Sequence, residues 1–135
     1  MKTVLYVCVH NAGRSQMAEA LTNALAKERG LPITALSAGT VAGTSVNPVA
    51  VAVMEEIGIS MAGHHPKQLT QEMADSAETV ITMGCGDACP VYPGTRYEDW
   101  VLDDPAGQPL EVVRGIRDDI RARVVRLLAE LGVSA

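Results

Sequence analysis

The stretch VLYVCVHNAGRSQMAEAL, residues 4–21, decides how this chain folds. It begins as an unbroken apolar run and passes through a polar loop. Apolar residues then recur every four positions, at Met17, Leu21 and, just beyond the stretch, Leu25. A continuous apolar run bounded by a loop is typical of a buried strand, and i, i+4 spacing is typical of an amphipathic helix. The sequence therefore predicts a strand over residues 3–9 and a helix over residues 15–29.

The rest of the chain continues this alternation. Further strands are expected over residues 33–37, 78–83 and 99–102, and a short helix over residues 70–75. Another helix should start at Pro48, because Asn47 before it is a typical N-cap, and should end at Gly58. Its expected buried face carries Val49, Val53, Met54 and Ile57. A closing helix should bury Ile116, Ile120, Val124, Leu127 and Leu131.

Strands that alternate with helices predict an α/β protein, with a parallel sheet covered by helices on both faces. At 135 residues, the chain fits one domain spanning residues 1–135. The net charge of −5 argues against nucleic acid or an anionic membrane as a partner. The sequence contains neither an apolar run of about 20 residues nor a signal-peptide pattern, so we expect a cytoplasmic protein.

The loops that follow the strands hold the reactive side chains. Cys8 and Arg14 follow the first strand, Cys85 and Cys89 follow the third, and Asp104 follows the last. Ligands bind in such sheets where the carboxyl ends of the strands meet. We therefore expect these groups to lie at one edge of the sheet.

The loop between the first strand and its helix is suited to bind an anion. The backbone N–H groups and dipole of a helix N-terminus attract anions, Gly13 allows unusual backbone angles, and Arg14 can bind two oxyanion oxygens. Such surroundings commonly lower the pKa of a thiol from about 8.5, so Cys8 is expected to react as a thiolate. Ser15 can donate to this sulfur, and Asn11 can hold the loop in shape. The expected oxyanion loop consists of Cys8, Val9, His10, Asn11, Ala12, Gly13, Arg14 and Ser15.

Each of these features also has a purely structural interpretation. A lone cysteine can simply end a buried strand, and an aspartate before proline is a common turn former. Cys85 and Cys89, with Cys8 or His10, could bind zinc, but no obvious fourth ligand accompanies them, so no metal is predicted. A structural role is favoured for the histidine pair at positions 64 and 65.

Two motifs, CVHNAGRS at residues 8–15 and DDPAG at residues 103–107, resemble those of the low-molecular-weight protein tyrosine phosphatase superfamily. The first matches its C-x5-R-S phosphatase P-loop, and the second its general acid, which the resemblance assigns to Asp104. Phosphotyrosine phosphatases usually carry aromatic residues just after the D-P pair, where this chain has Ala106, Gly107 and Gln108. A small inorganic oxyanion is therefore favoured over an aryl phosphate.

Within this superfamily, the segments TMGCGDACPVYP, RYEDWVLDDPAG and IRDDIRARV are similar to those of thioredoxin-coupled, three-cysteine arsenate reductases. The resemblance implies a role in arsenical resistance, with Cys8 attacking arsenate while Arg14 stabilises its oxygens and Asp104 protonates the leaving oxygen. Cys85 would then attack Cys8 and release arsenite, and Cys89 would attack Cys85. The resulting redox-active disulfide would be reduced by thioredoxin or another small redox protein, with no bound cofactor. The alternatives are a phosphatase and a reductase coupled to mycothiol and mycoredoxin.

Three features depart from the resembled family. Cys85 and Cys89 are closer in sequence than in its best-known members, and i, i+4 positions of a regular helix, about 5–6 Å apart at Cβ, are too far apart for a disulfide at about 3.8 Å. We therefore expect an irregular segment there. His10 and Gly13 stand where other members have Gly and Cys, which bears on loop dynamics. Lys67 stands at an acidic position that helps some relatives bind potassium, so no such ion is predicted.

Overall fold

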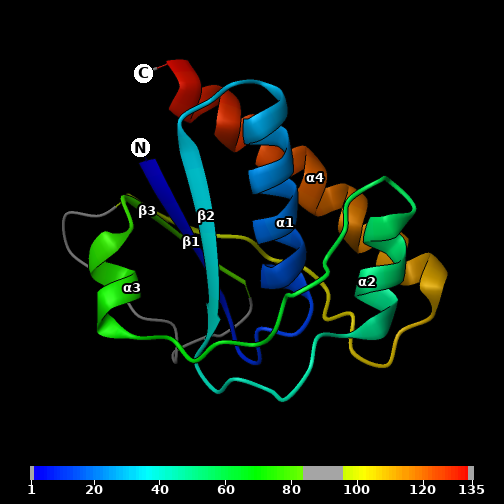
Figure 1. Cartoon of the computed structure of the whole chain (residues 1–135). Coiled ribbons are helices and arrows are strands. Elements are labelled where there is room, and N and C mark those ends of the chain that lie inside the picture. The colour runs from blue at the N-terminus through cyan, green and yellow to red at the C-terminus, as the bar shows by residue number, and fades with distance from the viewer. Residues whose placement is uncertain (1, 84–95, 134–135) are drawn as a thin grey trace.

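The computed structural model describes residues 2–83 and 96–133 (Figure 1). Cys85 and Cys89 lie outside the described residues. The strands are β1 (Lys2–Cys8), β2 (Ile33–Gly39), β3 (Thr79–Thr82) and β4 (Arg96–Asp99). The helices are α1 (Arg14–Glu28), α2 (Pro48–Glu55), α3 (Gln71–Ser76) and α4 (Leu110–Val133).

The four strands form one parallel sheet in the order β2-β1-β3-β4. β1 is central and pairs with strands on both sides, Cys8 opposite Gly39 of β2 and Val7 opposite Thr82 of β3. Figure 1 shows α3 on one side of the sheet and α1, α2 and α4 on the other. The α/β fold with helices on both faces is therefore confirmed.

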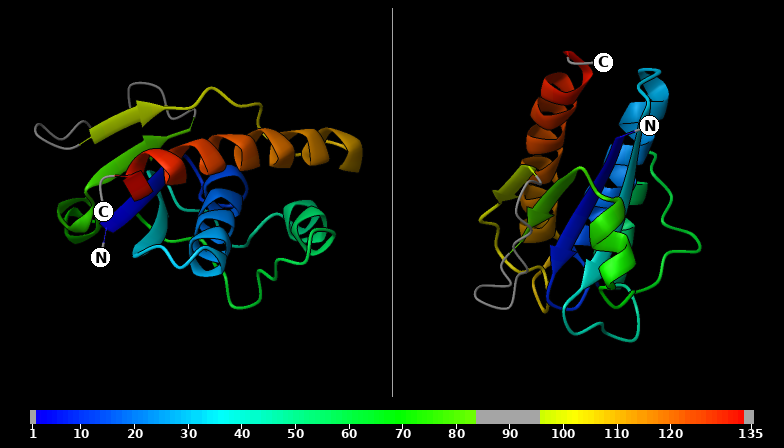
Figure 2. Two further views of the ribbon diagram at one scale, coloured as in Figure 1. Left: turned by 90° about the horizontal axis from the view of Figure 1, so that it is seen from above. Right: turned by 90° about the vertical axis from the view of Figure 1, so that its left-hand side faces the viewer.

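Two hydrophobic clusters explain why β1 is an unbroken apolar run. Val4, Tyr6 and Cys8 pack into the larger cluster, with α1, α2 and α4, whereas Leu5 and Val7 pack into the smaller cluster, on the side of α3. Burying a large apolar side chain stabilises a fold by roughly 1.5–3 kcal/mol, so both faces of β1 favour apolar residues. α4 contacts both α1 and α2, and Figure 2 shows it running across them.

The prediction of a last strand over residues 99–102 is wrong, because β4 lies three residues earlier, at Arg96–Asp99. The apolar triplet that suggested a strand begins at Trp100, which is buried just beyond β4 and packs against Tyr6 with ring centroids 5.7 Å apart. The next residue, Val101, is 79% exposed. The triplet therefore marks where the chain is anchored in the core after leaving the sheet.

The remaining helices follow the expected signals, with small differences. The side chain of Asn47 caps α2 by accepting a hydrogen bond from Val49 N at 2.9 Å, as predicted. α2 ends at Glu55, and Ile57, which was expected on the buried face, is exposed. The five apolar positions predicted to be buried in the closing helix are all buried in α4. In residues 2–83 and 96–133, no helix is both long and apolar enough to cross a membrane.

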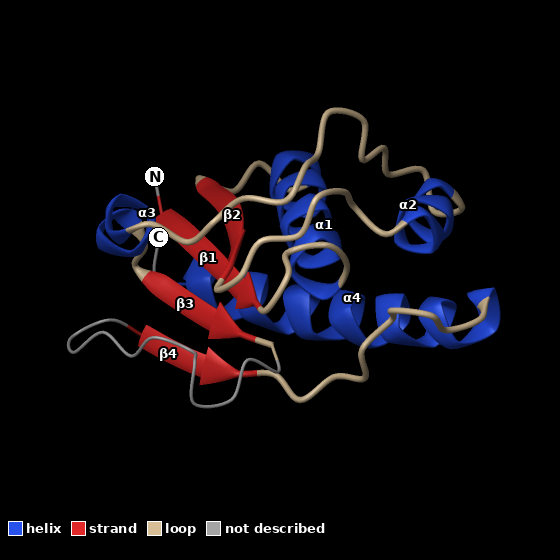
Figure 3. Ribbon diagram, turned by 90° about the horizontal axis from the view of Figure 1, so that it is seen from below, coloured by secondary structure: helices blue, strands red, loops and turns tan. Residues whose placement is uncertain are grey.

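Figure 3 shows β1, β3 and β4 pointing toward the same edge of the sheet. The oxyanion loop, residues 8–15, leaves β1 at this edge. Met83, the last described residue before the gap, also lies there and donates a hydrogen bond from its backbone N to Val7 O at 2.8 Å. The loop after β4 brings Asp104 to the same edge.

Candidate active site

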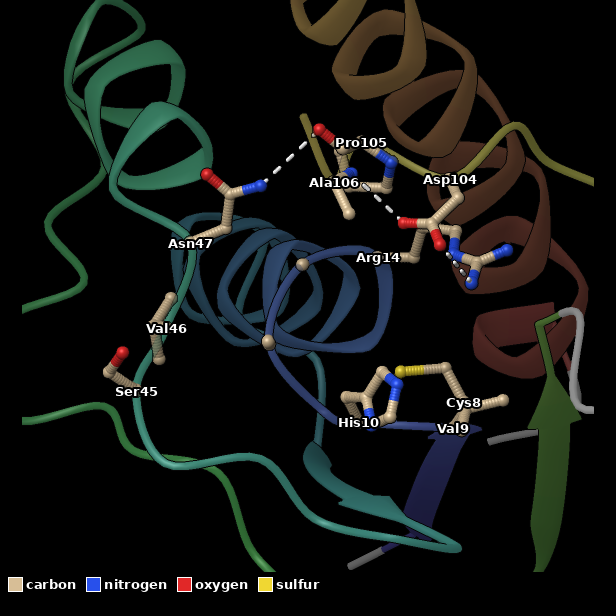
Figure 4. A pocket seen from close by; sticks show the side chains of 12 residues that line it. Cys8, Val9, His10, Arg14, Ser45, Val46, Asn47, Asp104, Pro105 and Ala106 are labelled. Atoms are coloured by element: carbon tan, nitrogen blue, oxygen red, sulfur yellow. Dashed lines mark hydrogen bonds and ion pairs between the residues drawn. The ribbon is translucent and has the colours of Figure 1, made fainter. Parts of the chain in front are cut away.

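The oxyanion loop, the segment before α2 and the loop after β4 enclose a cavity of about 270 Å³ (Figure 4). Its lining consists of Cys8, Val9, His10, Ala12, Gly13, Arg14, Ser45, Val46, Asn47, Asp104, Pro105 and Ala106. The structure thus brings Asp104 close to Cys8 and Arg14, although it lies about ninety residues further along the sequence. Among the described residues, the lining includes no Tyr or Trp.

The sulfur of Cys8 is buried and receives hydrogen bonds from its own loop. The backbone N–H of Asn11 donates to Sγ at 3.2 Å, and Ser15 Oγ lies 2.9 Å from Sγ. Asn11 Nδ2 donates to Ser15 Oγ at 2.7 Å, so the hydroxyl proton of Ser15 is free to point at the sulfur. Hydrogen bonds donated to sulfur favour its charged, nucleophilic form.

Asn11 holds this arrangement in one orientation. The backbone N–H of Lys67 donates to Asn11 Oδ1 at 2.9 Å, which identifies that atom as the oxygen and leaves Nδ2 to face Ser15. Gln16 Nε2 also donates to Oδ1, at 2.9 Å. Asn11 is fully buried and has a φ of 54°, a left-handed conformation that asparagine tolerates better than most residues. The expected role of Asn11 in shaping the loop therefore agrees with its contacts.

The structure gives a steric reason for a glycine at position 13. Its φ is −137°, so it does not occupy the left-handed region. A Cβ at this position would instead lie 2.6 Å from Cγ of Pro105. Gly13 is required because the loop that carries Asp104 packs directly against the oxyanion loop.

Arg14 and Asp104 meet at the rim of the cavity. A guanidinium nitrogen of Arg14 donates to Leu102 O at 3.2 Å, and another lies 3.9 Å from Oδ2 of Asp104. The other carboxylate oxygen of Asp104 accepts a hydrogen bond from Ala106 N at 3.0 Å. Figure 4 shows the guanidinium beside this carboxylate. The Asp104 side chain is 61% exposed, so it can be reached from solvent.

The histidines differ in their surroundings. His10 is exposed at the cavity, and its Nδ1 lies 3.0 Å from Val41 O, an oxygen that can only accept. His64 is half-buried, and its Nδ1 lies 2.8 Å from Oε1 of the fully buried Gln16. Position 16 carried no signal in the sequence, although Gln16 links the oxyanion loop to the segment around His64 and His65.

Lys67 lies beside an acidic side chain behind the oxyanion loop. Its Nζ is 3.5 Å from Glu19 Oε1, which also accepts a hydrogen bond from Ser37 Oγ at 2.8 Å. The carboxylate of Glu19 therefore already has a cationic partner. In the described part of the chain, no cluster of three His, Cys, Asp or Glu residues could hold a metal ion.

Residues 3–134 match the profile of the low molecular weight phosphotyrosine protein phosphatases, and the chain belongs to this family. Within it, the chain is 39% identical over 134 residues to a glutaredoxin arsenate reductase of Synechocystis sp., covering 97% of this chain and 99% of the relative. It is also 39% identical over 127 residues to a putative arsenate reductase of Halobacterium salinarum, covering 93% and 89% of the two chains.

Solved structures of arsenate reductases and of a low molecular weight phosphatase superpose on this chain. A thioredoxin-dependent arsenate reductase of Corynebacterium glutamicum superposes with a TM-score of 0.83 at 36% identity, covering all of this chain and 63% of the other. An arsenate reductase in a phosphate-binding state has a TM-score of 0.84 at 37% identity, with 96% and 98% covered. A low molecular weight protein tyrosine phosphatase from T. tengcongensis has a TM-score of 0.88 at 27% identity, with 96% and 99% covered.

Proposed function

We propose that this protein is an enzyme that reduces arsenate to arsenite through a relay of three thiols. The observation that carries the proposal is the buried sulfur of Cys8, which accepts a hydrogen bond from Asn11 N at the base of a cavity with Arg14 at its rim. The relatives named as arsenate reductases support the choice of arsenate, since they align over nearly the whole chain.

The first step would attach arsenic to the enzyme. Arg14 and the backbone N–H groups of the oxyanion loop stabilise the charged oxygens, and the Cys8 thiolate attacks arsenic. An S–As bond forms, an As–O bond breaks, and the departing oxygen leaves as water after accepting a proton from Asp104. The position of Asp104 at the cavity rim supports this role.

The second step would transfer electrons. A thiolate of Cys85 attacks the sulfur of Cys8, an S–S bond forms, and the S–As bond breaks with its electron pair going to arsenic. Arsenic is thereby reduced from oxidation state five to three and leaves as arsenite. The hydrogen bond from Met83 N to Val7 O supports this step, because Cys85 is only two residues beyond Met83 and Cys8 directly follows Val7.

The third step would restore Cys8. A thiolate of Cys89 attacks the sulfur of Cys85, the Cys8–Cys85 bond breaks, and the Cys8 thiolate is regenerated. An external dithiol protein then reduces the Cys85–Cys89 disulfide. We favour thioredoxin because three cysteines suffice for an internal relay, while the glutaredoxin-named relative makes glutaredoxin the main competitor. A reducing compartment such as the cytoplasm suits this chemistry.

A phosphatase activity is the second candidate, because the family is named for it and the oxyanion loop would also suit phosphate. The cavity lining favours the reductase, since it offers no Tyr or Trp among the described residues to hold the ring of a phosphotyrosine. Weak hydrolysis of aryl phosphates is nevertheless expected of the shared oxyanion loop.

The proposal is tested by measuring arsenite formed per chain with thioredoxin, glutaredoxin and small-thiol systems in parallel. Cys8→Ser should form none. Cys89→Ser should release one arsenite per chain and stop, and Cys85→Ser should release none, while both retain any hydrolysis of aryl phosphates. Multiple turnovers by Cys85→Ser with thioredoxin would refute the internal relay. Turnover of wild type with a small thiol alone would identify that thiol, rather than thioredoxin, as the reductant.

A further inference from the structure

Asn47 connects three segments that enclose the cavity. Its backbone N donates to Ala12 O in the oxyanion loop at 2.7 Å. Its Oδ1 accepts from Val49 N at the start of α2, and its Nδ2 donates to Pro105 O at 3.4 Å, directly after Asp104. Figure 4 shows the side-chain amide reaching across the cavity toward Pro105.

The orientation of this side chain is fixed by its cap contact. The backbone N–H of Val49 can only donate, so the atom that it contacts is the oxygen of Asn47, and the NH₂ group faces Pro105. Capping alone would be served equally well by serine or aspartate. Only an amide of this length caps α2 and also donates to the loop that carries Asp104.

The loop that carries Asp104 also has contacts that do not involve Asn47. Pro105 packs against Gly13, Arg14 contacts Leu102 O, and Gln108 N donates to Pro105 O from within the same loop. Asp104 itself is largely exposed, and its distance to Arg14 is 3.9 Å. The hydrogen bond from Asn47 therefore adds a restraint on this loop from the start of α2.

We propose that Asn47 is a positioning residue that holds the loop carrying Asp104 over the oxyanion loop, through the carbonyl of Pro105. The inference rests on the proposed role of Asp104 as proton donor. A misplacement of a catalytic group by about 1 Å can slow a reaction by up to about a hundredfold, so a single restraint of this kind is able to affect turnover.

The test uses two variants that retain the cap. Asn47→Ser is neutral but too short to reach Pro105, and Asn47→Asp keeps the length but cannot donate. Both should lower kcat for arsenate about tenfold with little change in Tm. Only Asn47→Asp should also raise KM, because it adds a negative charge beside the bound oxyanion. The matched control is Asn23→Ser, which removes an amide that bridges α1 to Ala35 away from the cavity, and which should keep wild-type kcat.

Combination with Asp104→Asn distinguishes positioning from a general structural role. If Asn47 acts through Asp104, then Asn47→Ser should lower kcat less than twofold further in the Asp104→Asn background. Losses that multiply in the double variant would overturn the inference.

A measurement without substrate separates this inference from the proposed function. Solvent exchange of the Ala106 and Gln108 amides, followed by NMR, should become several-fold faster in Asn47→Ser but not in Asn23→Ser. Unchanged exchange would overturn the positioning role even if arsenate is reduced. If wild type reduces no arsenate, the proposed function fails, and faster exchange would still support the restraint of the loop.

Discussion

At the scale of single residues, a short series of hydrogen bonds surrounds the sulfur of Cys8, the proposed nucleophile. Lys67 N–H fixes the amide of Asn11, Asn11 donates to Ser15, and the hydroxyl of Ser15 is left to face Cys8. Ser15 Oγ already accepts from Asn11 Nδ2, which leaves its own hydroxyl proton for the sulfur of Cys8 at 2.9 Å. The hydroxyl proton therefore points at the sulfur without requiring any rearrangement when substrate arrives.

Replacing Ser15 with alanine should slow the chemistry of Cys8. A hydrogen bond to a charged group contributes about 1.5–3 kcal/mol, so Ser15→Ala should reduce the rate of Cys8 alkylation by iodoacetamide at pH 7 about tenfold or more. The control is Ser45→Ala, which removes a hydroxyl elsewhere in the same cavity. Equal alkylation rates in Ser15→Ala and wild type would show that the hydroxyl does not support the thiolate.

Replacing Gly13 with alanine should displace the loop that carries Asp104. The new methyl group would meet Pro105 at 2.6 Å, and overpacking of this kind typically costs about 1–3 kcal/mol. We expect a lower Tm and a loss of arsenate turnover of about tenfold. Gly115→Ala in α4 is the control, because a Cβ there meets nothing within 4 Å, and this variant should keep its activity and gain stability. Full activity in Gly13→Ala would show that the close approach does not matter.

The members of the oxyanion loop were predictable because their chemistry is local. Cys8, Asn11 and Ser15 lie within eight residues, and the turn from strand to helix brings them together whatever the rest of the fold does. Asn47 and Lys67 reach the loop only through the packing of distant segments. The sequence therefore revealed Asn47 as a helix cap but not as a contact of Pro105.

At the scale of elements, charged side chains attach the edge strand β4 to α4. Glu98 of β4 accepts hydrogen bonds from Arg126 of α4 at 2.7 Å and from Arg96 at 3.0 Å, and Arg96 also pairs with Glu130 of α4. The sequence pattern could not reveal this strand, because its residues are polar and their partners lie about thirty positions away. The apolar residues just after it gave the stronger but misleading signal.

The surroundings of Glu98 make part of the stability depend on pH. Burial raises the pKa of Glu98. Hydrogen bonds from Trp100 and Arg96 and the charge of Arg126 lower this pKa by more than burial raises it, so the net pKa lies below its usual 4.5. A carboxyl group with a lowered pKa in the folded state stabilises the fold above the unfolded pKa. This contribution is lost as the pH falls through the folded pKa.

Glu98→Gln should therefore lower the free energy of unfolding by about 1 kcal/mol at pH 7. The difference from wild type should begin to shrink near pH 4.5, where Glu98 of the unfolded chain takes up a proton, and should be lost once the pH falls through the lower pKa of the folded state. Urea unfolding followed by circular dichroism at several pH values measures this. Glu72→Gln on the exposed face of α3 is the control and should show a smaller difference at pH 7. A constant Glu98→Gln effect down to pH 3 would contradict the assignment.

At the scale of the whole molecule, a chain with a net charge of −5 must bind its anionic substrate through a local arrangement. The arrangement that we propose combines the backbone N–H groups of the oxyanion loop with the guanidinium of Arg14, at the carboxyl end of the central strand. The general fold was predictable because alternating strands and helices allow few topologies. The three-dimensional partners of each loop were not, since they depend on packing between distant segments.

Oxyanions should stabilise the folded protein even without turnover. At about 100 times its Kd, arsenate or phosphate should add about 2.7 kcal/mol, which corresponds to a rise in Tm of several degrees. Sodium chloride at equal ionic strength should not reproduce this shift. Arg14→Ala should lose most of it, whereas Arg29→Ala, at the C-terminal end of α1, should retain it. Equal shifts in both variants would place the oxyanion outside this loop.

The position of β1 between two hydrogen-bonded neighbours has a consequence for how activity is lost. Partial opening of a protein usually begins at edges and chain ends, so fluctuations that detach β4 or fray α4 leave β1 paired on both sides. Cys8 therefore remains at the end of a strand that is hydrogen-bonded on both sides in most partly opened forms of the molecule. During slow denaturation, the environment of the nucleophile should persist until the sheet as a whole comes apart.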